Sequence, residues 1–578
     1  MAAEIRVWAP SASAVDVLAG EHRTAMRDAG GGWFAAPRSA AAPDGTYMFS
    51  LDGGPGRPDP RSASQPGGIH GPSQLVDHDH FQWTDAGWAG FPLADAVIYE
   101  VHTGTFSPEG TFDGIIARLP HLLELGVNAI ELMPVAAFPG DRGWGYDGVD
   151  IFAPTATYGG PEGFKRLVDA CHNAGIAVVL DVVYNHLGPD GNYLAEYGPY
   201  FTDVYQTPWG TPFNFDGPGS DEVRRFFADN AVGWLRDYHC DGLRLDAVHA
   251  IIDTSAVHVL EEIRDLVRDF DASTGRAHWL IAESDSNDPR VVAPGARGGY
   301  GFDGQWSDDF HHALHSTLTG ERTGYYQDFG PLADVATALR QAYVYAGRYS
   351  GYRARTHGRL PVGLPGTAFL GYIQDHDQVG NRARGERIST LLAPGLTRVA
   401  AALVLFSPFT PMLFAGEEWA ASTPFLYFTD HQSADLGRAV TRGRRREFAA
   451  FGWPAADIPD PQDRGTFEAS RLRWDEVAQP PNKEMLDWYR ALLRLRRDEP
   501  ALRDGRLDAV EVTFDEAARW LVVRRGDLAL ACNLGGEAVE LKVPGALLLA
   551  SAPGASTPTG ETLRLPAESA AVVRREPG

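Results

Sequence analysis

Hydrophobic and polar residues follow three different patterns along this chain of 578 residues. From residue 3 to about residue 51, short alternating runs such as EIRVWAP and AVDVLAG are separated by Gly, Pro and Asp. Alternation with a period of two, broken by turn-forming residues, predicts a small β-sandwich. The segment 53–73 that follows is rich in Pro, Gly and Ser, and we interpret it as a connector.

The middle of the chain alternates short apolar strands with amphipathic helices. Strands are predicted at 96–102, 129–135, 176–183, 242–246, 279–284, 369–377 and 410–419, and helices at 113–126, 161–175 and 482–497. Alternating β and α units imply a parallel sheet, and close to eight strands over roughly 400 residues favour a closed (β/α)8 TIM barrel with loop insertions. After about residue 503, the runs AVEVTF, WLVVRR, LALACNL and SAAVVRR predict a C-terminal β-sandwich.

These patterns predict an α/β protein of three domains. An N-terminal Ig-like β-sandwich with its connector spans residues 1–88, the barrel spans residues 89–500, and a C-terminal β-sandwich spans residues 501–578.

Composition and charge narrow the possible partners. The chain has 51 basic and 76 acidic residues and a net charge of −25, which disfavours nucleic acids and anionic membranes as partners. Its three cysteines, Cys171, Cys240 and Cys532, are few and far apart, so we expect no disulfide framework and a reducing compartment. The start, MAAEIRVWAP, lacks the features of a secretory signal, and the longest apolar runs are too short to cross a bilayer. We therefore expect a soluble cytoplasmic protein.

Polar residues follow several of the predicted barrel strands at the point where each strand ends. They are Asp181 and His186, Arg244 and Asp246, Glu283, and His376 and Asp377, and the loop after the second strand adds Tyr146. Each of them alone could be a helix cap, a structural ion pair or loop packing. Because the carboxyl ends of parallel barrel strands meet at one face, however, their convergence favours an active site.

The residue types in this set suit one kind of chemistry. Carboxylates, an arginine and two histidines provide the nucleophile and the proton donor that glycoside cleavage requires. Phosphoryl transfer fits poorly, because the sequence has no Gly-rich phosphate loop and is strongly acidic.

Four segments in order, DVVYNH, GLRLDAVHA, IAES and QDHDQVGN, resemble the four sequence regions of the α-amylase family of glycoside hydrolases. Three more, ELMPVAAFPGDRGWGYDGVD, NFDGPGSDEVRRF and QPGGIHGPS, resemble the branch of that family that acts on maltooligosyl trehalose and releases trehalose by cutting the adjacent α-1,4 bond. A branching or debranching enzyme of the same family, or a catalytically inactive carbohydrate-binding protein, remain alternatives at this point.

The resemblance implies roles for individual residues. Asp246 would be the nucleophile of a retaining reaction, Glu283 the general acid and base, and Asp377 a stabiliser of the distorted sugar ring. Arg244 would keep Asp246 ionised with support from Asp181. His186, His376 and Tyr146 would contact the same sugar.

Three further expectations concern the edges of this site. His249, Asp285, Trp306 and Asp308 are candidates for contacts with the trehalose side of the substrate. Asp375 replaces a residue that is usually uncharged in the family, and would share a strand face with Asp377 if that strand stays extended. Neither a cofactor nor a metal is implied, although Asn185 matches a calcium ligand of many amylases.

Overall fold

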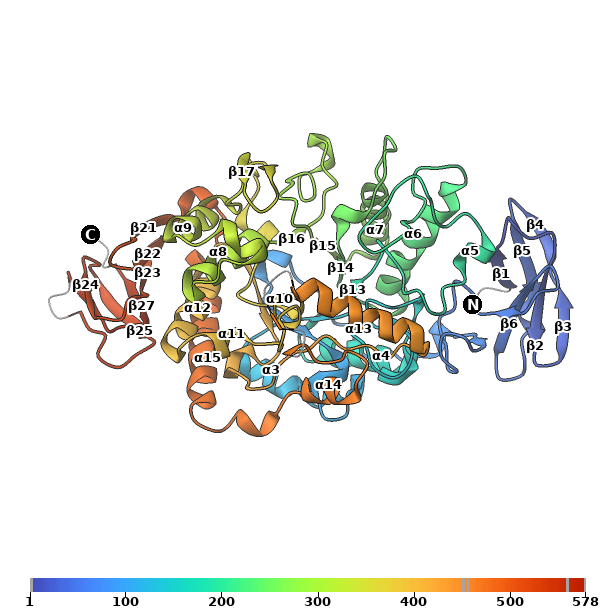
Figure 1. Cartoon of the computed structure of the whole chain (residues 1–578), viewed down its shortest axis with the longest axis horizontal. Coiled ribbons are helices and arrows are strands. Elements are labelled where there is room, and N and C mark those ends of the chain that lie inside the picture. The colour runs from blue at the N-terminus through green and yellow to red at the C-terminus, as the bar shows by residue number, and fades with distance from the viewer. Residues whose placement is uncertain (1–3, 450–452, 455–456, 558–560, 576–578) are drawn as a thin grey trace.

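The computed structural model describes residues 4–449, 453–454, 457–557 and 561–575. Within them, eight parallel strands close into a barrel at the centre of the molecule, with a region of β-sheet at each end (Figure 1). The prediction of a (β/α)8 barrel between two β regions is confirmed. In their order around the barrel, the strands are β10 (Ala129–Leu132), β13 (Ala177–Val182), β14 (Gly242–Leu245), β15 (Trp279–Ala282), β16 (Gly304–Trp306), β19 (Phe369–Gly371), β20 (Thr410–Phe414) and β9 (Ile98–Val101).

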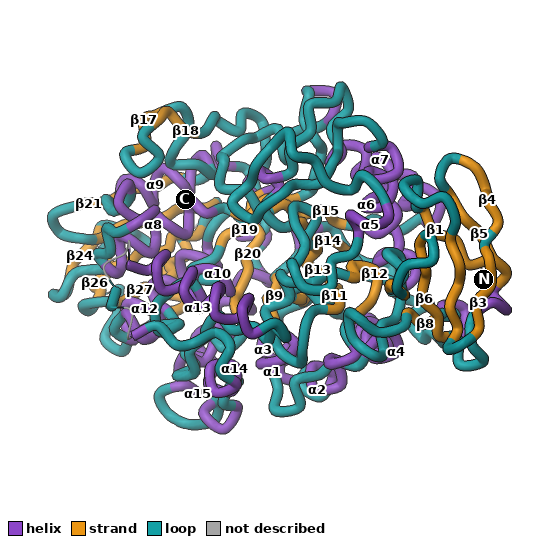
Figure 2. Tube along the Cα trace, turned by 45° about the vertical axis from the view of Figure 1, so that its right-hand side comes forward, coloured by secondary structure: helices purple, strands orange, loops and turns teal. Residues whose placement is uncertain are grey.

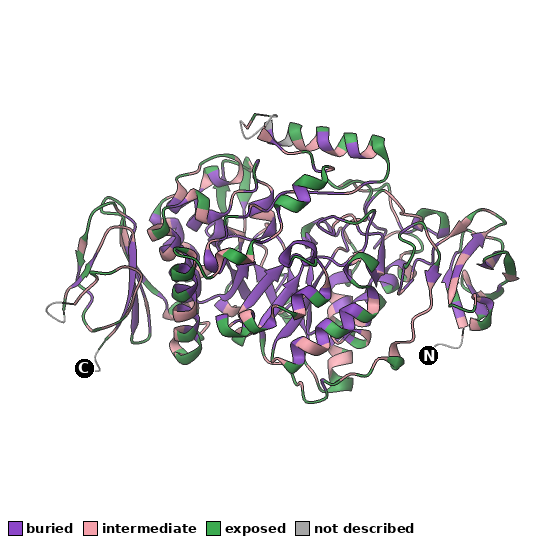
Figure 3. Ribbon diagram, turned by 90° about the horizontal axis from the view of Figure 1, so that it is seen from below, coloured by how far each residue is buried: buried purple, intermediate pink, exposed green. Residues whose placement is uncertain are grey.

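The barrel strands are apolar because both of their faces are covered. Every residue of β9, β10, β13, β14 and β15 is buried, which explains their near-continuous runs of Val, Ile and Leu. The buried strands form the centre of Figure 3, and helices with exposed outer faces surround them. The register between neighbouring strands sets the site, because it places Asp181 of β13 directly opposite Arg244 of β14.

Three barrel strands differ most from the sequence-based prediction, and one of them is β20, which ends at Phe414 although a strand was predicted over 410–419. Strand β16 was missed, because its three residues form no apolar run that a pattern could reveal. The strand predicted over 369–377 was too long: β19 ends at Gly371, and Asp375 is instead the N-cap of a short helix that begins at His376.

The barrel and its loops carry the helices. The helix predicted over 113–126 is two helices, because Pro120 lies in the first turn of the second and disfavours a continuous helix before it. The helices are α1 (Thr103–Phe106), α2 (Phe112–Ile116), α3 (Leu119–Leu125), α4 (Gly160–Asn173), α5 (Leu194–Tyr197), α6 (Ser220–Asp237), α7 (Val259–Thr274), α8 (Asp308–Thr319), α9 (Leu332–Gln341), α10 (His376–Gly380), α11 (Ile388–Leu391), α12 (Pro394–Phe406), α13 (Ala434–Ala449), α14 (Arg464–Ala469) and α15 (Asn482–Asp498).

The two terminal regions lie on opposite sides of the barrel (Figure 2). The N-terminal sheets have the strand orders β1-β5-β4 and β3-β2-β6-β7, with β8 beside β6, and the C-terminal sheets have the orders β21-β22-β23-β27-β25 and β24-β26. Their strands are β1 (Glu4–Trp8), β2 (Val15–Ala19), β3 (His22–Ala25), β4 (Arg27–Gly30), β5 (Trp33–Pro37), β6 (Thr46–Leu51), β7 (Gly56–Arg57), β8 (Ser73–Gln74), β21 (Glu511–Asp515), β22 (Trp520–Arg525), β23 (Leu528–Asn533), β24 (Val539–Leu541), β25 (Ala546–Ala550), β26 (Leu563–Leu565) and β27 (Ser569–Arg574).

We propose that the domain boundaries lie near residues 88 and 500, as the sequence pattern predicts, although residues 1–3 and 576–578 of these ranges lie outside the described residues. Two small hairpins, β11 (Ala136–Ala137) with β12 (Asp150–Pro154) and β17 (Arg348–Ser350) with β18 (Arg355–His357), project from barrel loops. Among the described residues, no helix is long and apolar enough to cross a membrane.

Candidate active site

A cleft of about 640 Å³ opens at the carboxyl ends of the barrel strands. Of the residues that the sequence assigned to a site, it is lined by Tyr146, His186, Arg244, Asp246, His249, Glu283, Asp285, Asp308, His376 and Asp377. Asp181 and Trp306 lie beneath this surface, and both are almost completely buried. The structure therefore brings the predicted residues together around one cavity.

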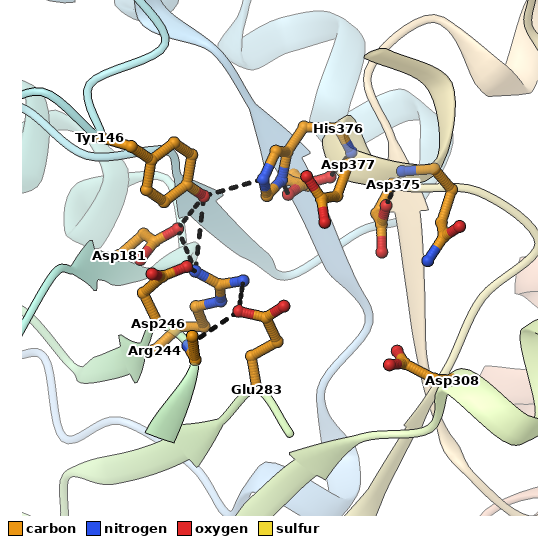
Figure 4. A network of polar contacts seen from close by, with 12 residues as sticks. Tyr146, Asp181, Arg244, Asp246, Glu283, Asp308, Asp375, His376 and Asp377 are labelled. Carbon is orange, nitrogen blue, oxygen red and sulfur yellow. Dashed lines mark hydrogen bonds and ion pairs between the residues drawn. The ribbon is translucent and has the colours of Figure 1, made fainter. Parts of the chain in front are cut away.

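The guanidinium of Arg244 is the centre of the site (Figure 4). Its Nη1 donates to Asp181 Oδ2 at 2.7 Å and to Asp246 Oδ1 at 2.9 Å, and its Nη2 donates to Glu283 Oε2 at 2.7 Å. Parallel strand register produces this arrangement, since Asp181 pairs with Arg244 and the backbone N–H groups of Asp246 and Glu283 continue the ladder beyond β14 and β15. One buried cation thus holds three carboxylates at the barrel mouth.

The pKa of Asp246 is raised, although a carboxylate kept ionised by Arg244 would be expected to have a lowered pKa. Burial raises the pKa of Asp246, and although the charge of Arg244 lowers it, burial outweighs that effect. The pKa of Glu283 is likewise raised by burial and lowered by Arg244, while the charge of Asp246 raises it further. Because Arg244 contacts both carboxylates, it does not select Asp246 for ionisation, and the two groups titrate as an interacting pair.

A second buried pair fixes His376. Burial alone would lower the pKa of His376, but the charge of Glu100 and its hydrogen bond raise that pKa to about 10. Glu100 Oε1 lies 2.5 Å from His376 Nδ1, and the second ring nitrogen lies 2.8 Å from the hydroxyl of Tyr146. The Tyr146 hydroxyl donates in turn to Asp181 at 2.6 Å. An imidazolium with both ring N–H groups donating satisfies this chain and connects the end of β9 to the Arg244 cluster.

Asp375 and Asp377 do not share a strand face, because the chain has turned into α10 at that point. Asp375 Oδ1 accepts from the backbone N–H of Gln378 at 2.7 Å, so the unusual carboxylate caps the helix. Burial, and then the charge of Glu100, raise the pKa of Asp375 well above its usual range, and the charge of Asp377 adds to this effect.

Trp306 occupies a different place from the one expected. Its ring lies 4.3 Å from the Arg244 guanidinium carbon, and the side chain is 2% exposed inside the barrel. The expectation of a direct contact with the leaving sugar is therefore wrong. Trp306 does not line the cleft, and its ring instead packs against the guanidinium of Arg244.

Asp308 does face the cleft, at the first residue of α8. It accepts a hydrogen bond from the hydroxyl of Tyr372 at 2.5 Å, and burial raises its pKa to about 8. At neutral pH this carboxyl group is mostly protonated and can donate a hydrogen bond to a ligand.

We expect Asp308→Asn to stabilise the protein at alkaline pH. An aspartate in an unfolded chain has a pKa of about 3.9, so the unfolded state loses its proton first, and stability falls as the pH rises from about 4 to about 8. Asparagine removes this dependence. The thermal midpoint should rise by about 2 to 4 °C at pH 8 and should not change near pH 4. An equal change at both pH values would contradict the assignment, and Asp435→Asn, at a side chain that is 93% exposed, is the control.

Several residues of the site were missed by sequence reasoning. Glu100 of β9 and Glu131 of β10 interrupt apolar strands at paired positions, and that interruption was the available signal. Burial raises the pKa of Glu131 well above its usual range. Three further residues line the cleft: Trp209 on a loop, Asn381 just after α10, and Arg444 on α13. No pattern of hydrophobic and polar residues marks these positions as part of a site.

Helix α13, which lies outside the barrel sheet, contributes Arg444 to the lining of the cleft. Its Arg444 donates to Asn381 Oδ1 and to the carbonyl of Gly380, both at 2.6 Å. Asn381 Nδ2 donates to Asp377 Oδ1 at 2.8 Å. Arg444 therefore positions Asp377 through a single intervening amide.

Arg444→Ala should lower kcat about tenfold and change KM less, because Asp377 loses its fixed orientation when Asn381 loses its partner. Steady-state kinetics with the glycosyl substrate measures this effect. The matched control is Arg442→Ala, an exposed arginine on the same helix, which should keep full activity. Equal kcat values for the two variants would show that the Arg444 contact does not position Asp377.

The described residues contain no group of three or more His, Cys, Asp or Glu side chains that could hold a metal ion. Asn185, the position that matches a calcium ligand in many amylases, is buried, and both polar atoms of its amide lack a hydrogen-bond partner among the described residues.

Comparison with known proteins places the chain in a family. Residues 72–206 match the model of the alpha amylase catalytic domain, and residues 505–572 match a domain of unknown function. The malto-oligosyltrehalose trehalohydrolase of Mycobacterium tuberculosis is 48% identical, with 95% of each chain covered, and that of Arthrobacter ramosus is 47% identical, with 99% of each chain covered. The chain belongs to the malto-oligosyltrehalose trehalohydrolase family.

A solved structure from Salmonella typhimurium has the same overall fold as this member of the trehalohydrolase family. It has a TM-score of 0.90 and 40% identity, and the match covers 99% of this chain and 97% of that one. A 1,4-alpha-glucan branching enzyme of Bacillus caldolyticus is 34% identical over only 41% of this chain. The full-length relatives thus favour trehalohydrolase over the branching-enzyme alternative.

Proposed function

We propose that this chain hydrolyses the α-1,4 bond that joins a maltooligosaccharide to the terminal trehalose of maltooligosyl trehalose, releasing free trehalose. Membership of the trehalohydrolase family supports the choice of substrate. The observation that carries the chemistry is the pairing of Asp246 and Glu283 with the two terminal nitrogens of one guanidinium, inside the cleft. Such closely spaced carboxyl groups fit a retaining glycosidase, in which one attacks and the other transfers protons.

In the proposed reaction, Asp246 attacks the anomeric carbon of the glucose on the glucan side of the bond. Glu283, protonated as one member of the interacting pair, donates its proton to the glycosidic oxygen, and trehalose leaves. Glu283 then takes a proton from water, and that water releases the maltooligosaccharide from Asp246. Arg244 remains bound to the carboxylates throughout and limits the charge that builds up between them.

The remaining residues bind and distort the reacting sugar. Asp377 and the imidazolium of His376 lie on the same wall of the cleft, where they can hydrogen-bond hydroxyl groups of the ring. Tyr146, whose ring stacks on that of His376, and His186 line the same cleft. We place His249, Asp285 and Asp308 on the side of the departing trehalose. Asp285 follows Glu283 by two residues in the chain, and the charges of His249 and Asp308 interact with that of Glu283.

The test is the product pattern from two substrates of equal length. Chromatography of a maltotriosyl trehalose digest should show trehalose and maltotriose as the first products. Maltopentaose should be cleaved with a kcat/KM at least about a hundredfold lower, because polar groups shaped for trehalose stay unpaired with a linear chain. Equal cleavage of both substrates would make this a general amylase, and transfer products without hydrolysis would make it a branching enzyme.

A further inference from the structure

The segment between the N-terminal sheets and the barrel contains a loop that folds back on itself. We call residues 64–74 the connector loop, and it includes the segment QPGGIHGPS. The backbone N–H of Gln74 donates to the carbonyl of Ser64 at 2.9 Å, which closes the loop, and its last two residues form β8 beside β6 (Figure 2). The connector loop is therefore fixed to the N-terminal sheets, with Ile69 and His70 near its middle.

Part of the cleft wall is a loop with no helix or strand of its own. Residues 183–193, here called the wall loop, join the end of β13 to the start of α5, and the structure describes all of them. His186, Leu187 and Pro189 of this loop line the cleft. Because no helix or sheet hydrogen bonds fix such a segment, contacts with its neighbours must set its position.

The wall loop is in close contact with both the barrel and the connector loop. The backbone N–H of Gly188 donates to the carbonyl of Gly148 at 3.2 Å, and a Cβ at position 188 would lie 2.2 Å from the carbonyl oxygen of Asp147. A Cβ at Gly191, whose φ is +84°, would lie 2.6 Å from Cδ1 of Ile69. Two close approaches that only glycine permits therefore tie the wall loop to Asp147 of the barrel and to Ile69 of the connector loop.

Ile69 and His70 contact the barrel in different ways. Ile69 is buried in an apolar cluster in and beside the β11–β12 hairpin, with Ala137, Val149 and Ala153. The ring of His70 joins two side chains of the wall loop, since its Nδ1 lies 2.7 Å from the Tyr193 hydroxyl and its Nε2 lies 3.1 Å from Asp190 Oδ1. The His70 side chain is 49% exposed, so its removal leaves no buried cavity. A buried apolar contact and an exposed pair of polar contacts thus hold the wall loop from the N-terminal side.

We propose that Ile69 and His70 are positioning residues, which hold the wall loop so that His186 keeps its place in the cleft. The side chain of His186 has one hydrogen bond of its own, because its Nε2 donates to the carbonyl of Tyr146 at 3.0 Å while its Nδ1 has no partner among the described residues. Its position therefore depends on the backbone that carries it, and Asp190, a partner of His70, follows it by four residues. This inference rests on the proposed function, because it concerns a residue of the same cleft.

The experiment uses two substrates that share the maltotriosyl group. Maltotriosyl trehalose has trehalose as its leaving group, whereas α-maltotriosyl fluoride has only fluoride. His70→Ala should lower kcat/KM about five- to tenfold on both, because a misplaced His186 affects the sugar that both contain. Its thermal midpoint should change by no more than about 2 °C, since exposed side chains contribute little to stability. His70→Gln keeps a donor and an acceptor and should recover most of the activity.

Removal of His186 separates positioning from a general loss of structure. In a His186→Ala background, the further change His70→Ala should lower kcat/KM by less than about twofold, since the side chain that it positions is absent. Ile69→Ala should show the same difference between the two backgrounds, together with a lower thermal midpoint, because it removes a buried side chain.

The control is His22→Ala, at an exposed histidine of β3 in the N-terminal sheets, which should keep full activity on both substrates. An unchanged kcat/KM in His70→Ala, a loss confined to maltotriosyl trehalose, or an equally large loss in the His186→Ala background would overturn the proposal. Products of the unmodified protein test the underlying function separately. If maltotriosyl trehalose yields no trehalose, the proposed function fails, whereas the effect of His70 can still be measured with maltotriosyl fluoride.

Discussion

Asp246→Asn is expected to lower kcat on maltotriosyl trehalose by at least about a thousandfold, the scale on which a covalent nucleophile contributes. The amide has the shape of the carboxylate and keeps an oxygen for the Arg244 N–H, so the fold should survive. It lacks the negative charge that attacks the anomeric carbon, and the loss should be as large with α-maltotriosyl fluoride, because both substrates need the same nucleophile. Initial rates with each substrate, together with thermal unfolding of the variant, measure this outcome.

The stereochemistry of the product checks the same assignment in the unmodified protein. Two displacements at one carbon retain configuration, so proton NMR should detect the α-anomer of the maltooligosaccharide first, before mutarotation. A β-anomer as first product, or a folded Asp246→Asn variant with near-normal turnover, would show that Asp246 is not the nucleophile.

Glu283→Gln is expected to produce a different pattern, and the difference identifies the acid. Turnover of maltotriosyl trehalose should fall by at least about a thousandfold, because the trehalose oxygen cannot leave without a proton. Fluoride needs no such proton, so the first step with maltotriosyl fluoride should remain fast. The second step needs Glu283 as a base, and the glycosyl-enzyme should accumulate. The expected observation is a rapid burst of fluoride of about one equivalent per enzyme molecule, followed by slow turnover.

Absence of this burst, combined with equal losses on both substrates, would show that Glu283 acts in the attack and not as the acid. Asp308→Asn is a useful comparison, since it changes another carboxyl group of the same cleft whose pKa is raised to about 8. It should give no burst of fluoride and keep its turnover of α-maltotriosyl fluoride, whereas its KM for maltotriosyl trehalose should rise, because Asp308 is placed on the side of the departing trehalose.

The sequence by itself determined the barrel and the centre of its site. Strands that are covered on both faces are mostly apolar, and alternation with helices indicates a parallel sheet, so these features are visible in local patterns. Parallel strands also end at the same face, which is why Asp181, Arg244, Asp246 and Glu283 could be grouped before any contact was known. Strand β16 escaped because three residues do not establish a period.

Only the tertiary structure decided which side chains reach the cleft from elsewhere. Trp209 and Arg444 arrive on a hairpin and on an outer helix, and no local periodicity specifies where such segments fold back. The structure also decided where side chains point at positions that the sequence had already singled out. Trp306 ends β16, the strand that was not predicted, and packs against Arg244, whereas Asp375 caps α10. The physical reason is the same in each case. The position that a side chain reaches depends on the path of the backbone and on the atoms packed around it. A sequence pattern indicates only the period with which residues are buried.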